Sequence, residues 1–114
     1  MTKIDLSGVI PPVTTPFDEH GEIEYKSVKT QIDWLVDCGV SGIAVGGSTG
    51  EGHTLEADEF RTLINVALEA TDERIDVIAG IITDSTRESV RRGQMIPVSY
   101  THLRAHETSL HLVC

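Results

Sequence analysis

Residues 46–51 carry the side chains whose types and spacing could best bind a small ligand. The segment reads Gly46-Gly-Ser-Thr-Gly-Glu51, so three glycines surround the adjacent hydroxyl groups of Ser48 and Thr49. Glycine lets the backbone approach a ligand closely and exposes its N–H groups. We therefore interpret Ser48, Thr49 and their neighbouring amides as a candidate receptor for a small carboxylate or phosphate.

Two other interpretations of this segment remain open from the residues alone. A tight turn between a strand and a helix uses Gly and Ser for its geometry without any ligand. Residues 47–54 also come close to the phosphate-loop pattern G-x-x-x-x-G-K-[ST], but His53 stands at the lysine position. Glu51 would also place a negative charge beside nucleotide phosphates. The sequence therefore disfavours a nucleotide site.

The elements that position this segment follow from alternating apolar runs. Short runs rich in apolar residues centre near positions 11, 44 and 78, about 33 residues apart, which is typical of a strand-helix unit. The runs at 42–46 and 75–81 are uninterrupted and suit strands buried on both faces. The run at 8–16 is also extended, although its prolines cannot donate to a ladder at every position.

Three amphipathic helices are predicted between and after these strands. The first is indicated by an apolar face of Val28, Ile32, Leu35 and Val36, and Gly39 is expected to end it. The second is indicated by a face of Phe60, Leu63, Ile64, Ala67 and Leu68, with Thr54 as the expected N-cap. The third opens with an S-x-x-E capping box at Ser85 and Glu88 and runs to about Ile96.

Three consecutive βα units predict an α/β fold with parallel strands and right-handed crossovers. In such folds ligands bind at the carboxyl ends of the strands. Residues 46–51 directly follow the second predicted strand and therefore lie at that end. The pattern alone does not separate a closed barrel from an open sheet.

Residues 8–17, 39–54 and 77–80 resemble the dihydrodipicolinate synthase and N-acetylneuraminate lyase family. The matching strings are Gly8-Val-Ile-Pro-Pro-Val-Thr-Thr-Pro-Phe17, Gly46-Gly-Ser-Thr-Gly-Glu51 and Val77-Ile-Ala-Gly80. The resemblance runs collinearly over roughly residues 6–96. It implies a (β/α)8 TIM barrel, of which residues 1–96 would form the first three βα units, a truncated barrel.

The resemblance also implies a pyruvate-dependent class I aldolase or lyase that works through a Schiff base on a lysine. Ser48 and Thr49 would hold the carboxylate of the 2-keto acid, and Gly47 and Gly50 would shape the loop. The leading expectation is condensation of pyruvate with an aldehyde, as in 4-hydroxy-tetrahydrodipicolinate synthase. The alternatives are cleavage of N-acetylneuraminate or a 2-keto-3-deoxy sugar acid, and a non-enzymatic anion-binding barrel remnant.

The resemblance places the Schiff-base lysine and the catalytic tyrosine on strands beyond this chain. The lysines present are Lys3, Lys26 and Lys29, which precede the first predicted strand or belong to the first predicted helix. We therefore expect no catalytic residue here and an inactive 114-residue chain. Open strand edges and an uncovered inner surface also predict that the isolated chain aggregates or is molten. The intact protein is expected to be a homotetramer.

Residues 97–114 depart from the family pattern. Residues 98–108, Val-Ser-Tyr-Thr-His-Leu-Arg-Ala-His-Glu-Thr, resemble one reading frame of a transposon-type sequencing adapter, and Leu112-Val-Cys114 matches its continuation. We interpret this tail as read-through, to be excluded from fold reasoning. An alternative is a metal site, because His102 and His106 would stand at i, i+4 on a helix. We expect no metal and no cofactor.

Composition limits the remaining function classes. Nine Lys and Arg against eighteen Asp and Glu give a net charge of −9, which argues against a nucleic-acid or anionic-membrane surface. No run approaches the ~20 apolar residues of a transmembrane helix. Cys38 and Cys114 make no disulfide framework, and Cys38 is expected to be a buried, reduced residue on a helix. These features predict a cytoplasmic protein.

Overall fold

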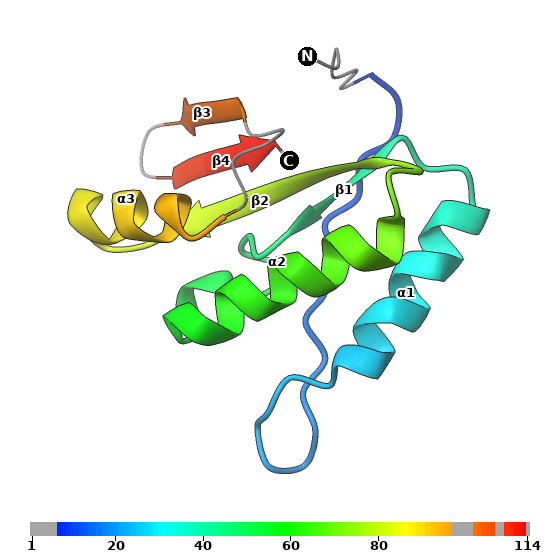
Figure 1. Cartoon of the computed structure of the whole chain (residues 1–114), viewed down its shortest axis with the longest axis horizontal. Helices are drawn as coiled ribbons and strands as arrows, with labels where there is room; N and C mark the ends of the chain where they lie inside the picture. The colour runs from blue at the N-terminus through cyan, green and yellow to red at the C-terminus, as the bar shows by residue number, and fades with distance from the viewer. Residues whose placement is uncertain (1–6, 97–101, 107–108, 114) are drawn as a thin grey trace.

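The computed structural model describes residues 7–96, 102–106 and 109–113 (Figure 1). In chain order the elements are α1 (Tyr25–Asp37), β1 (Gly42–Val45), the short 3₁₀ helix η1 (Gly52–Thr54), α2 (Ala57–Thr71), β2 (Asp76–Ile82), α3 (Thr86–Gln94), β3 (His102–His106) and β4 (Ser109–Val113). The four strands form one sheet in the order β1-β2-β4-β3. The chain is therefore an α/β structure, as the sequence predicts.

Strands β1 and β2 are parallel neighbours, as expected for consecutive βα units. Their register pairs Gly42 with Asp76 and continues to Val45 opposite Ala79. The two predicted apolar runs thus become adjacent strands, and α2 makes the crossover between them.

The first of the three expected strands is present only as a single parallel bridge between Pro12 and Ala44. The Val13 N–H donates to the Ala44 carbonyl oxygen at 2.8 Å, and the Ala44 N–H donates to the Pro11 carbonyl oxygen at 3.0 Å. Pro11 has no N–H with which to extend the ladder toward the start of β1. The segment follows the β1 edge, but the expected count of three complete βα units is not confirmed.

Helices α1 and α2 lie together on one face of the β1–β2 pair (Figure 1). The apolar faces predicted for both helices are buried or partly buried against the sheet. The buried core consists of Val13, Ile23, Val28, Ile32, Ile43, Val45, Leu55, Phe60, Leu63, Ile64, Ala67, Val77, Ala79, Ile81 and Ile96. Successive strand residues alternate between faces, and Ala44 and Ile78 on the opposite face are only half-buried.

The helix ends differ in part from the predictions. The N-cap of α2 is Glu56 rather than Thr54, and the Glu56 N–H donates to the Glu59 carboxylate at 2.9 Å. Thr54 instead belongs to η1. At α3 the predicted cap is confirmed, because the Ser85 hydroxyl accepts from the Glu88 N–H at 3.1 Å. Cys38, at the C-terminal end of α1, is exposed rather than buried.

The tail contributes an antiparallel hairpin to the sheet. Strand β4 pairs with β2 from Ile78 opposite Val113 to Ile82 opposite Ser109, and β3 pairs with β4 on its far side. Residues 102–106 form a strand, so the helical spacing assumed for a metal site at His102 and His106 is wrong. Residues 97–101, 107, 108 and 114 lie outside the described part of the chain.

Within the described ranges, no helix is long and apolar enough to cross a membrane. The sheet face opposite α1 and α2 bears on the solution behaviour of the chain. Large exposed apolar patches on soluble proteins mark interaction sites or aggregation liabilities. The face that carries Ala44 and Ile78 is apolar and half-buried rather than fully exposed, so the association expected of the isolated chain stays a prediction.

Substitution of Ile78 and of Ile81 by Glu tests which face of the sheet is covered. Ile81 is fully buried, so an unpaired carboxylate there should disrupt the core. We expect Ile81→Glu to raise the fluorescence of the dye ANS, which reports exposed apolar surface. Ile78→Glu should lower that fluorescence or leave it unchanged, because it makes the half-buried face more polar. An equal rise in both variants would contradict the assignment of faces.

Candidate active-site loop

The segment 46–51 leaves the carboxyl end of β1 and turns back at once into η1. Ser48 and Thr49 lie exposed at the turn, whereas Gly50 is buried and Gly47 is half-buried. Within the described residues, neither the hydroxyl nor the N–H group of Ser48 or Thr49 has a hydrogen-bond partner. The turn therefore presents adjacent polar donors to solvent at the end of the sheet where α/β folds bind ligands.

The loop lies directly against backbone, and this requires glycine at specific positions. A Cβ on Gly52 would overlap the carbonyl oxygen of Gly46, and a Cβ on Gly80 would come within 2.8 Å of the Gly47 Cα atom. Gly46 also has a φ of +76°, a left-handed conformation that side chains disfavour. These contacts fix the loop against the ends of both parallel strands.

A buried hydroxyl from the first segment holds the middle of the loop. Thr15 Oγ1 donates to the Gly50 carbonyl oxygen at 2.5 Å, and Thr15 is 5% exposed. A Cβ on Gly50 would approach the Val13 carbonyl oxygen within 2.9 Å, so the loop also packs on that segment's backbone. Sequence reasoning missed Thr15, and the signal available was its place in the matched string that ends at Phe17.

Hydrogen bonds within the loop complete its closure. The Glu51 N–H donates to the Ser48 carbonyl oxygen, and the Gly52 N–H donates to the Gly47 carbonyl oxygen, both at 3.0 Å. Glu51 has a φ of 57°, so it adopts the left-handed conformation without being glycine. A Ser–Thr pair enclosed by two such bonds is held in one turn geometry.

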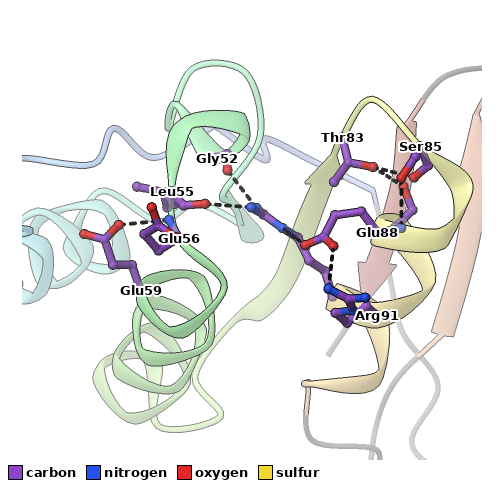
Figure 2. A network of polar contacts seen from close by, with 10 residues as sticks. Gly52, Leu55, Glu56, Glu59, Thr83, Ser85, Glu88 and Arg91 are labelled. Atoms are coloured by element: carbon purple, nitrogen blue, oxygen red, sulfur yellow. Dashed lines mark hydrogen bonds and ion pairs between the residues drawn. The ribbon is translucent and has the colours of Figure 1, made fainter.

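Arg92 of α3 reaches the far end of the loop. Its Nη1 donates to the Gly52 carbonyl oxygen at 2.8 Å and its Nη2 to the Leu55 carbonyl oxygen at 2.6 Å. Figure 2 shows this network, in which Glu88 forms ion pairs with Arg91 and Arg92. Sequence reasoning missed Arg92. The available signal was its three-residue spacing from Ser89, the other buried residue of α3, which places both on one face of the helix.

The other candidate groups lie away from the loop. Lys26 and Lys29 are exposed on α1, as expected, and Lys3 lies outside the described residues. Among the described side chains, no group of three or more His, Cys, Asp and Glu residues is arranged to hold a metal ion. Burial raises the pKa of the Tyr25 hydroxyl, with a further contribution from the Glu59 carboxylate. Tyr25 belongs to α1 and not to the loop.

Neutral donors on a rigid turn are suited to a small anion such as a carboxylate. Hydrogen bonds to a charged acceptor are stronger than those between neutral groups. The model of the Dihydrodipicolinate synthetase family matches residues 5–98. The chain belongs to this family.

Individual relatives agree with that assignment. The 4-hydroxy-tetrahydrodipicolinate synthase of Methanococcus aeolicus is 38% identical over 89 residues, which are 78% of this chain and 31% of that protein. The crystal structure of a chloride-inhibited dihydrodipicolinate synthase from Acinetobacter baumannii, complexed with pyruvate, matches with a TM-score of 0.76 at 30% identity. That match covers 80% of this chain and 31% of the other.

The second branch of the family is also similar in structure. An N-acetylneuraminate lyase from Mycoplasma synoviae matches with a TM-score of 0.71 at 29% identity, over 77% of this chain and 31% of that one. The chain thus spans about a third of the length of the relatives that it matches. The overlap is consistent with part of a TIM barrel.

Replacement of Gly52 by Ala tests the contact between the loop and β1. We expect Gly52→Ala to lower the free energy of unfolding by about 1–3 kcal/mol, the usual effect of overpacking. The control is Gly47→Ala, because a Cβ there has nothing within 4 Å. This variant should stay within about 1 kcal/mol of the parent. Urea denaturation of the intact protein, followed by circular dichroism, measures both variants, and equal losses would contradict the packing described.

Proposed function

We propose that this chain is part of a pyruvate-dependent class I aldolase that resembles 4-hydroxy-tetrahydrodipicolinate synthase. The observation that carries the proposal is the pair of unpartnered, exposed hydroxyls of Ser48 and Thr49 on a loop fixed at the carboxyl end of β1. The family membership and the pyruvate complex of a similar structure support the same ligand class.

Ser48 and Thr49 bind the carboxylate of the 2-keto acid with their hydroxyl and amide donors. Gly47 and Gly50 keep the turn in the shape that presents those donors. A carboxylate held there directs the 2-keto carbon toward the barrel axis, where a lysine from a later strand attacks it and forms an imine. The protonated imine accepts electrons, so an enamine forms and adds to an aldehyde. The reaction needs no metal ion.

The 114-residue chain by itself does not carry out this chemistry. Lys26 and Lys29 are on α1, away from the strand ends where a barrel places its catalytic groups. The loop of this chain accordingly binds the substrate carboxylate, and the remainder of the barrel supplies the nucleophile and the pocket for the aldehyde. The intact protein is cytoplasmic and forms a homotetramer.

Borohydride trapping with pyruvate separates the two parts of this proposal. The intact gene product should gain a reduced pyruvate adduct on one lysine, because borohydride reduces the imine to a stable amine. The 114-residue chain should gain none, as judged by mass spectrometry of the intact polypeptide. An adduct on Lys26 or Lys29 of the short chain would contradict the proposed division. Absence of an adduct on the intact protein would contradict Schiff-base chemistry.

Substitution of the two hydroxyl residues in the intact protein tests their role. Ser48→Ala and Thr49→Val should each raise the KM for pyruvate about tenfold or more, because a hydrogen bond to a charged group contributes ~1.5–3 kcal/mol. Ser48→Thr retains the hydroxyl and serves as the matched control, with a change below about threefold. Steady-state kinetics at saturating aldehyde measures all three variants. An unchanged KM in both hydroxyl-free variants would contradict carboxylate binding by this loop.

A second candidate is cleavage of N-acetylneuraminate or of a 2-keto-3-deoxy sugar acid. One observation favours it, the similarity to an N-acetylneuraminate lyase structure. The carboxylate loop serves both reactions, because both involve pyruvate. Release of pyruvate from a sugar acid by the intact protein, without condensation of pyruvate with an aldehyde, would favour the lyase.

Residues 1–96 form the barrel portion in this proposal, and residues 97–114 are a non-native tail. The match of the family model ends at residue 98, which supports this boundary. Sequencing the source locus across the codons for Met95 and Ile96 tests it. A frame that continues into a further strand supports the proposal. A locus that encodes Pro97 to Cys114 and a stop codon would instead favour an anion-binding barrel remnant.

A further inference from the structure

Arg92 is a buried cation that spans two parts of the fold. It is 6% exposed, in a helix whose other buried residue is Ser89. Its guanidinium carbon lies 5.3 Å from the centre of the Phe60 ring, within the range of a cation–π interaction. A buried charge persists only where it is paired and hydrogen-bonded. The identity of its partners therefore indicates what Arg92 holds in place.

Those partners are loop carbonyl groups and one carboxylate. The Gly52 and Leu55 carbonyl oxygens accept from the two terminal nitrogens at 2.8 and 2.6 Å, so the planar guanidinium spans both ends of η1. Glu88 Oε1 lies 3.5 Å from Arg92 Nε, an ion pair within the same helix. Arginine presents several donors in a fixed plane, whereas the lysine ammonium is a compact point charge. The two-carbonyl contact therefore suits the planar guanidinium better than a lysine ammonium.

The carbonyl contacts connect Arg92 to the ligand-binding turn through the backbone. Gly52, whose carbonyl binds Arg92, donates its own N–H to the Gly47 carbonyl oxygen. Gly47 immediately precedes Ser48. Release of Gly52 from Arg92 would therefore loosen the bond that closes the turn around Ser48 and Thr49.

We propose that Arg92 is a positioning residue, which holds the loop in the geometry that binds the substrate carboxylate. It acts through Gly52 and touches neither the substrate nor Ser48 and Thr49. This inference rests on the proposed function for its consequence in catalysis, but the effect on the loop itself does not. The α3 network also ties the loop after β1 to the segment after β2, where the Thr83 and Ser89 hydroxyls lie 2.6 Å apart.

Hydrogen exchange on the intact protein tests the positioning role directly. In Arg92→Met the amides of residues 48–55 should exchange at least tenfold faster, while those of β2 change less than twofold. Arg92→Lys should be intermediate, because it keeps the charge but loses the planar pair of donors. The control is Arg91→Met, which removes the exposed neighbour that pairs with the same Glu88 at 3.3 Å. This control should exchange like the parent.

Three results would overturn the inference. Equal acceleration in the loop and in β2 would show that Arg92 acts only on global stability. An identical effect of Arg91→Met would assign the effect to Glu88 pairing in general. Loop amides of the parent that exchange as fast as those of the denatured chain would show that Arg92 does not hold the loop.

Kinetics of the intact protein extends the test to function. Arg92→Met should raise the KM for pyruvate about tenfold and leave kcat within about threefold, with partial recovery in Arg92→Lys. If Ser48→Ala leaves the KM unchanged while Arg92→Met accelerates loop exchange, the proposed function fails and the positioning role stands. If Ser48→Ala raises the KM while Arg92→Met changes neither exchange nor KM, the positioning role fails alone.

Discussion

The contact of Gly52 with the Gly46 backbone is the constraint on which the rest of the site depends. Because Gly52 carries no Cβ, its backbone can lie against Gly46. The chain can therefore reverse immediately after β1 and lie on the ends of both strands. That reversal leaves Ser48 and Thr49 exposed and makes the Gly50 carbonyl available to the buried Thr15 hydroxyl. Arg92 then closes the far end of the same turn. A side chain at position 52 would move every one of these groups.

Much of the fold was predictable because its signals are local. The apolar spacing of α1 and α2 and the uninterrupted runs of β1 and β2 identify the elements without knowledge of their partners. The first predicted strand is present only as a single bridge for an equally local reason, because Pro11 has no N–H to donate to β1. Thr15 and Arg92 could not be found in this way. Their partners lie 35, 37 and 40 residues distant, and only the folded chain brings them together.

The two faces of the β1–β2 pair differ in their cover. Two helices cover one face of the β1–β2 pair, and the opposite face stays half-buried. In a closed barrel that second face forms the packed interior, with the catalytic groups of several strands around its upper rim. Here β4 occupies the β2 edge in antiparallel orientation. A parallel strand cannot add at that edge while the hairpin remains there.

A crystal structure of the intact protein with pyruvate tests the central claim most directly. The account predicts that the pyruvate carboxylate lies within about 2.7–3.1 Å of hydroxyl or amide donors of Ser48 and Thr49. It also predicts that Gly52 and Leu55 remain bound to Arg92 in that complex. Pyruvate bound to other residues, with the turn after β1 free of ligand, would contradict the account.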